Sequence, residues 1–218
     1  MKKLESGKAY FVKLIRVRPN SERVADAFLN IGDYYFEKND FEQAVAFYQK
    51  VQHYRDKLVV GWATYMEGWC YFNMGDKAKA MDRFLKSIQW SDKQRKAGHF
   101  VALDPKDQAQ QDMVRAYPFL KNASPAKAVG FFKRYAPKIY LKLCDKLVGL
   151  YAADSNYSAA NTLIKRLIKE IGPKDNRIMA YNRMILRNIY DSGDKQGTKA
   201  EVIALSAKIK TYSPEMMA

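Results

Sequence analysis

The chain has 218 residues, and its 38 lysine and arginine side chains against 23 aspartates and glutamates give a formal charge of +15. Nearly half of the residues are hydrophobic and 13% are aromatic, which excludes a disordered chain. No apolar run approaches the roughly 18 residues of a membrane span, and two cysteines are too few for a disulfide framework.

Residues 1–20 do not fit the repeats that follow, and we expect an N-terminal arm or a truncated helix there. The first three residues carry the charge of a signal peptide, but Glu5, Lys8 and Lys13 leave no apolar segment behind them. The sequence as it stands therefore favours a cytoplasmic protein. A periplasmic or cell-envelope location would require a signal segment that has been removed.

From residue 22 the chain repeats itself with a shift of 36 residues. Each copy is predicted to form a helix, a short polar turn at Asn39-Asp40 or Gly75-Asp76, and a second helix. We expect the small residues Gly32 and Ala44 to meet where the two helix axes approach each other. The matching positions are Gly32 and Gly68, Tyr35 and Tyr71, Phe36 and Phe72, Asp40 and Asp76, Ala44 and Ala80, and Tyr48 and Phe84.

This pattern resembles the tetratricopeptide repeat over residues 25–88. The second copy departs from the family in its first turn, where Thr64 and Glu67 stand at positions that are usually apolar, so unusual packing is expected there. The resemblance implies stacked helix pairs whose first helices line a concave groove. It also implies a non-catalytic scaffold that binds another protein.

Weaker copies of the same pattern follow along the chain. Ser124-Pro125 predicts the start of a helix, and Pro118 should kink or end the helix before it. We therefore predict an all-α, right-handed α-solenoid of about five antiparallel helix pairs, the third of them degenerate. Residues 21–212 should form a single domain and residues 213–218 a C-terminal tail. The predicted pairs are 22–52, 57–90, 105–135, 137–170 and 174–210.

Sequence motifs for catalysis or cofactor binding are absent. The chain has no phosphate-binding glycine loop, no dinucleotide-binding fingerprint and no nucleophile elbow. His53 and His99 have no cysteine or acid at metal-ligand spacing. Cys70 and Cys144 are expected to be unpaired packing residues. We therefore expect no enzyme, no cofactor and no metal site.

The groove positions that the resemblance assigns are aromatic in the second pair and mainly cationic in the last two. In the second pair they stand on one helix face, at Trp62, Tyr65, Trp69 and Phe72. In the later pairs they are Lys142, Arg183, Arg187 and Tyr190. Trp, Tyr and Arg often dominate the binding energy of interfaces, so we expect a protein or peptide partner with apolar and acidic residues. The alternative for the aromatic residues is that neighbouring helices cover them as core.

Charge distribution leaves a second hypothesis for the function. Residues 21–114 carry 13 basic and 14 acidic side chains, whereas residues 115–218 carry 19 and 8. A basic helical-repeat surface could bind single-stranded nucleic acid, although the neutral central region would interrupt a phosphate-binding track. A weaker resemblance, to repeat proteins of bacterial cell-envelope and gliding-motility assemblies, covers residues 57–170 and implies an adaptor in an envelope assembly.

Overall fold

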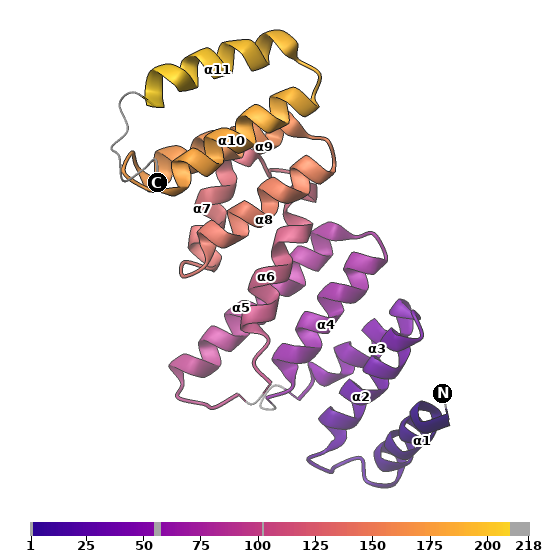
Figure 1. Cartoon of the computed structure of the whole chain (residues 1–218). Coiled ribbons are helices and arrows are strands. Elements are labelled where there is room, and N and C mark those ends of the chain that lie inside the picture. The colour runs from indigo at the N-terminus through magenta and orange to yellow at the C-terminus, as the bar shows by residue number, and fades with distance from the viewer. Residues whose placement is uncertain (1, 55–57, 102, 210–218) are drawn as a thin grey trace. The chain divides into compact units, whose positions relative to one another are not determined.

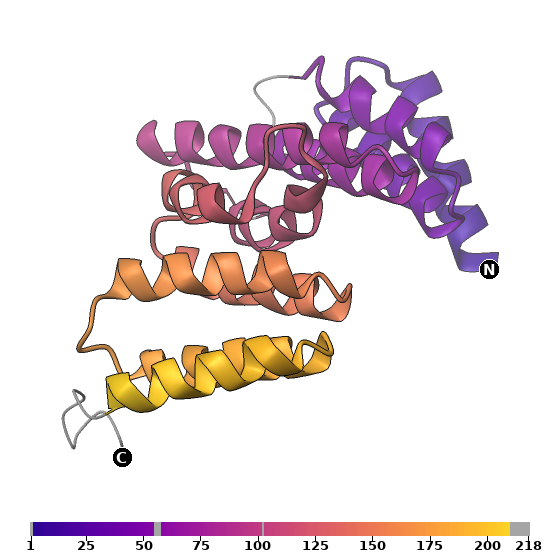
Figure 2. The same ribbon diagram turned by 90° about the horizontal axis from the view of Figure 1, so that it is seen from above.

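The structure is a computed structural model that describes residues 2–54, 58–101 and 103–209. The expected tail at 213–218 lies outside the described residues. Within them, the chain forms eleven α-helices and one 3-10 turn, with no strand, which confirms the all-α prediction (Figures 1 and 2). The helices are α1 (Lys2–Val17), α2 (Val24–Glu37), α3 (Phe41–Val51), α4 (Val60–Asn73), α5 (Lys77–Lys96), α6 (Lys106–Ala116), α7 (Pro125–Tyr135), α8 (Tyr140–Ala153), α9 (Tyr157–Ile171), α10 (Arg177–Asp191) and α11 (Lys195–Ile209).

Two compact units divide the chain, unit 1 over residues 1–121 and unit 2 over residues 122–218. In unit 1 each helix from α1 to α6 packs against the next one along the chain. In unit 2, α7 packs against α8 and α9, and the chain then continues pairwise through α9, α10 and α11. Figure 1 shows consecutive helices lying side by side within each unit. The single domain over residues 21–212 stays a prediction.

Four of the helix pairs share one kind of turn. A residue with positive φ ends the first helix, and an Asp or Asn follows it as the N-cap of the second. In the first pair φ of Asn39 is 58°, and the carboxylate of Asp40 accepts a hydrogen bond from the Gln43 amide at 3.2 Å. The same arrangement recurs at Gly75-Asp76, Ser155-Asn156 and Gly193-Asp194.

The predicted third pair is not a pair within one unit. Helix α6 ends at Ala116, and Pro118 lies in the 3-10 turn Tyr117–Phe119, as the proline predicted. However, α6 packs against α5 of unit 1, whereas α7 packs against α8 and α9 of unit 2. The physical reason is local: between α6 and α7 there is no residue with positive φ followed by an Asp or Asn cap, the turn that the four pairs above share.

The glycines of the repeat lie where the two helices approach closely, and each faces an aromatic ring as well as the alanine side of the second helix: a Cβ on Gly68 would also lie 3.3 Å from the Ala80 carbonyl oxygen. A Cβ on Gly32 would lie 2.5 Å from the ring of Tyr48, and a Cβ on Gly68 would lie 2.6 Å from the ring of Phe84. Each glycine therefore accommodates an aromatic ring of the facing helix, one turn beyond the buried alanine at position 44 or 80. Tyr48 and Phe84 are fully buried. Gly61 accommodates Trp90 of α5 in the same way.

The departure from the family at Thr64 and Glu67 produces a buried polar cluster. Glu67 has no exposed surface, and its Oε2 lies 3.1 Å from Nε of Arg83 on α5. The Gln52 amide donates to Glu67 Oε1 at 3.1 Å and to the Thr64 hydroxyl at 2.9 Å. Burial raises the pKa of Glu67, and the Arg83 charge opposes that shift. The unusual packing expected here is thus a polar junction of α3, α4 and α5.

Candidate protein-binding surface

The four aromatic residues predicted on α4 do lie on one face of that helix. The rings of Trp62 and Tyr65 are 5.3 Å apart between centroids, and those of Trp69 and Phe72 are 5.4 Å apart. Tyr65 and Trp69 both pack against Phe84 of α5, at 5.8 and 5.9 Å. The stripe is therefore continuous with the core of unit 1 on one side.

Tyr65 belongs to that core. It is 7% exposed, its hydroxyl donates to the Asp112 carboxylate of α6 at 2.7 Å, and the same oxygen accepts the indole N–H of Trp69 at 2.8 Å. Burial and the bond to Asp112 raise the pKa of Tyr65. Tyr65 is therefore a core residue, as the alternative interpretation of the aromatic residues had it. Tyr65 would contribute to binding only by orienting Trp69.

The other three aromatic residues, Trp62, Trp69 and Phe72, are half-buried, and we call them the aromatic edge. Lys77 covers part of Phe72, with its Nζ 3.4 Å from the ring centroid, and donates a hydrogen bond to the Phe72 carbonyl. Trp69 is held in one orientation by the bond to Tyr65. The edge thus offers preorganised aromatic surface at one helix face of unit 1.

In unit 2, α10 presents the predicted cationic residues on its exposed face. Arg183, Arg187 and Tyr190 are all exposed, and Tyr190 retains 72% of its surface. Arg187 forms an ion pair with Asp191 at 2.8 Å. The opposite face of the helix is buried in the unit, through Ile178, Tyr181 and Ile185.

Lys142 lies on α8 and is exposed. It stands one turn before Asp145, whose carboxylate accepts the Tyr181 hydroxyl of α10 at 2.6 Å. Lys142 therefore lies on the side of α8 that turns toward α10. The aromatic edge belongs to unit 1 and these cations belong to unit 2, so each forms a candidate surface by itself.

Tyrosine–carboxylate hydrogen bonds between helices are the feature that sequence reasoning missed. Besides Tyr65–Asp112 and Tyr181–Asp145, the Tyr34 hydroxyl of α2 donates to Glu5 of α1. The partners are 47, 36 and 29 residues apart, so no helical period could have paired them. Their consequence is that each of these three carboxylates already accepts a hydrogen bond from another helix.

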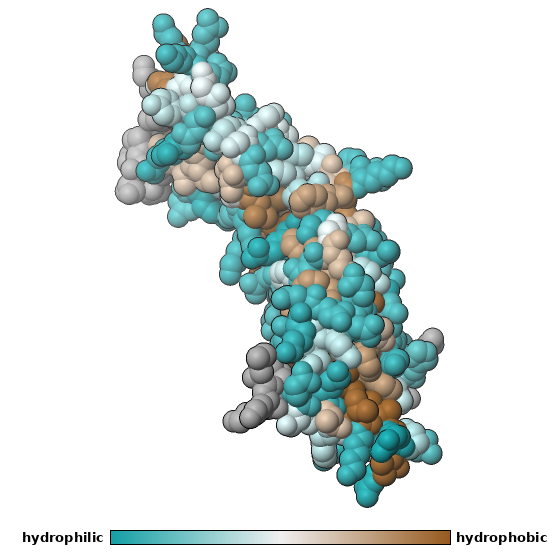
Figure 3. Space-filling model, turned by 90° about the vertical axis from the view of Figure 1, so that its right-hand side faces the viewer, coloured by the Kyte–Doolittle hydropathy of each residue, from teal (hydrophilic) through white to brown (hydrophobic). Residues whose placement is uncertain are grey.

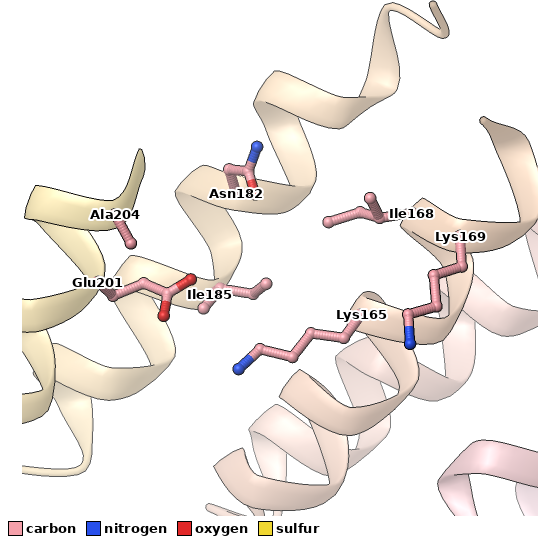
Figure 4. A pocket seen from close by; sticks show the side chains of 7 residues that line it. All are labelled: Lys165, Ile168, Lys169, Asn182, Ile185, Glu201 and Ala204. Carbon is pink, nitrogen blue, oxygen red and sulfur yellow. The ribbon is translucent and has the colours of Figure 1, made fainter. Parts of the chain in front are cut away.

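A hollow of about 390 Å³ lies in unit 2 between α9, α10 and α11 (Figure 4). Lys165 of α9 and Glu201 of α11 extend toward each other across it. Lys169 adds a second positive charge to the lining. Its lining residues are Lys165, Ile168, Lys169, Asn182, Ile185, Glu201 and Ala204.

Neither cysteine has the surroundings of a nucleophile. Cys70 and Cys144 are free and buried, and burial raises the pKa of each thiol to about 12. In the described residues, no group of three or more His, Cys, Asp or Glu side chains could hold a metal ion. His53 and His99 are exposed. None of the described helices has the length and apolar character that a membrane crossing requires.

Stacked helix pairs with a recurring turn define a helical-repeat protein. Family comparison makes this class specific, since two models of the tetratricopeptide repeat match the chain, at residues 25–54 and 62–89. The two matched segments are therefore tetratricopeptide repeats, and both lie in unit 1. No curated protein matches it.

Proposed function

We propose that this chain is a non-catalytic scaffold that binds a segment of a partner protein against the aromatic edge of α4. Tetratricopeptide repeats suggest a protein–protein interaction scaffold in general; the surface and the kind of partner are our proposal. The observation that carries it is the arrangement of Trp62, Trp69 and Phe72, half-buried on one helix face with the Trp69 indole fixed by Tyr65.

Preorganisation is the physical reason for choosing this surface. A ring already fixed in its bound orientation loses little conformational entropy when a partner covers it, so more of the burial energy contributes to affinity. A central aromatic anchor can contribute about 2 kcal/mol or more to binding. We therefore expect the partner to supply an apolar side chain to the aromatic edge.

The exposed cations of unit 2 are the reason to expect acidic residues in the partner. Lys142 and Arg183 are exposed, and neither takes part in an ion pair within the described residues. Exposed charges of this kind set association rate and orientation more than affinity, and salt screens them. An adaptor role in a bacterial envelope assembly would be consistent with such a scaffold, and it rests on the weaker resemblance alone.

Affinity capture with paired variants tests the proposal. Trp69→Ala should abolish capture of the partner at any salt concentration, whereas Arg183→Ala should weaken it chiefly at low salt. Phe100→Ala is the matched control, because Phe100 is an aromatic side chain of unit 1 that is 84% exposed in the loop after α5. Circular dichroism of each variant checks that the fold is kept.

Two outcomes would overturn the proposal. If Trp69→Ala and Phe100→Ala lower capture equally, the aromatic edge has no specific role. If single-stranded RNA of random sequence binds the parent tightly and dissociates steeply as salt rises, the basic surface binds phosphates and the nucleic-acid hypothesis replaces ours.

A further inference from the structure

Helix α1 has two different sides, and only one of them is covered. Toward α2, Glu5 accepts the Tyr34 hydroxyl and lies 3.9 Å from Lys38. On the same side, Nζ of Lys8 stands 4.6 Å from the ring centroid of Tyr34 and 4.7 Å from that of Tyr35. These contacts hold α1 against α2, and they engage the carboxylate of Glu5.

The other side of α1 is apolar and open. Tyr10 is 64% exposed and Val17 is 61% exposed, with half-buried Leu14 between them. These positions stand at i, i+4 and i+7, the spacing of one helix face. Figure 3 shows brown, apolar surface gathered at the lower end of the molecule, the end where α1 lies in Figure 1.

A hollow of about 380 Å³ accompanies this apolar stripe, lined by Tyr10, Lys13, Leu14, Val17 and Arg18. Lys13 and Arg18 are exposed cations at this hollow, Arg16 is a further exposed cation of α1, and none of the three forms a salt bridge within the described residues. The surface is therefore an apolar stripe with positive charge on and beside it.

We propose that this face of α1 binds an amphipathic helix of a partner protein whose apolar residues are flanked by acidic ones. Such a helix would pack against α1 as α2 does on the other side. Its apolar residues at three- and four-residue spacing would fit beside Tyr10, Leu14 and Val17, and its acids would pair with Lys13 and Arg18. The inference concerns a surface separate from α4 and does not rest on the proposed function.

Two other occupants fit the surface less well. A lipid bilayer has no side chain of fixed shape to fill the hollow lined by Tyr10, Leu14 and Val17, whereas the apolar side chains of a helix can enter it. A second copy of the chain would bring the same cations against each other, and like charges across an interface are unfavourable. The hollow together with charge complementarity therefore favours an acidic helix.

The probe for the test is a fluorescein-labelled synthetic helix of about five turns, with leucines on one face and glutamates flanking them. Fluorescence anisotropy with the full chain should show saturable binding. Lys13→Glu/Arg18→Glu should weaken it about tenfold or more, equivalent to about 1.4 kcal/mol. The same variant should bind a counterpart peptide with lysine in place of glutamate better than the parent does. Tyr10→Ser/Val17→Ser should also lose binding.

The matched control is Lys127→Glu/Lys138→Glu, which changes the net charge equally at two exposed lysines of unit 2. It should bind the acidic peptide within about twofold of the parent, and so should Trp69→Ala. Equal weakening by the control, or no binding to the parent, overturns the proposal. Two further results, each without peptide binding, also overturn the proposal. One is sedimentation of the parent with anionic vesicles, and the other is a dimer of the parent that Tyr10→Ser/Val17→Ser dissociates.

Discussion

At the residue scale, Gly32 shows how a missing Cβ sets the packing of a helix pair. The ring of Tyr48 occupies the space where the Cβ would be. The Tyr48 hydroxyl donates a hydrogen bond to the Asp33 carboxylate at 2.7 Å. The ring is fully buried and has no free direction in which to move. The glycine is therefore required by the aromatic ring of the next helix.

Gly32→Ala should consequently destabilise the chain by about 1–3 kcal/mol, because the new methyl group overpacks the contact. Urea unfolding at constant slope measures the change. Gly149→Ala, in the interior of α8 with no atom within 4 Å of the new Cβ, should leave the free energy of unfolding unchanged or raise it by up to about 1 kcal/mol. Equal losses in both variants would contradict the assigned contact.

Glu67 predicts a specific dependence of stability on pH. Its pKa in the folded chain lies above the ordinary 4.5, so the folded state holds the proton more tightly than the unfolded state. The contribution of this group to stability is therefore fully present below about pH 4.5 and is lost as the pH rises through the raised pKa. Glu67→Gln has no carboxyl group that must lose its proton inside the fold. The parent should therefore lose stability relative to this variant as the pH rises from 4.5 to neutrality.

Urea unfolding of both proteins across that pH range measures the difference. Asp191→Asn, at an exposed acid of α10 that pairs with Arg187 in unit 2, is the comparison. It should give a nearly flat difference over the same range, since exposed pairs contribute little. A flat difference for Glu67→Gln as well would show that the carboxylate is not desolvated.

Cys70 and Cys144 should be unreactive in the folded chain. Burial raises the pKa of both thiols to about 12, so little thiolate exists at mildly alkaline pH and reagents cannot reach the sulfur atoms. A thiol-specific reagent should label neither cysteine in the native protein and both in denaturant. Fast labelling of either one in the native protein would refute its burial.

At the scale of the element, the repeated turn explains why the helix pairs could be predicted. A left-handed residue followed by Asp or Asn is a local signal, because one residue tolerates positive φ and the next caps the following helix. The sequence therefore indicated the turns at Asn39-Asp40 and Gly75-Asp76 correctly. The contact of Gly32 with the ring of Tyr48 depends on the rotation of the two helices about their axes, which spacing does not define.

The caps themselves contribute stability. Asp76→Ala removes the acceptor for the Lys79 amide, at 3.0 Å in the structure, and should cost about 1 kcal/mol. Asp76→Asn keeps an acceptor and should recover most of that loss. Thermal unfolding of the two variants against the parent gives the comparison, and an equal melting temperature for Asp76→Ala and the parent would exclude a stabilising cap.

At the scale of the whole molecule, the sequence predicted the class of fold but only part of the candidate surface. Periodicity placed Trp62, Tyr65, Trp69 and Phe72 on one helix face, and the structure agrees. It could not separate buried Tyr65 from its half-buried neighbours, since Asp112, which binds the Tyr65 hydroxyl, lies 47 residues away. Nor did spacing indicate that α6 and α7 belong to different units.

All three tryptophans of the chain, Trp62, Trp69 and Trp90, lie in unit 1. Tryptophan emission is consequently a built-in spectroscopic label for one unit, and unit 2 is silent when tryptophan alone is excited. Far-UV circular dichroism, in contrast, reports the helices of both units. Recording the two signals during one denaturation of the intact chain will show whether the units unfold together or in sequence, without a dye, a truncation or a substitution.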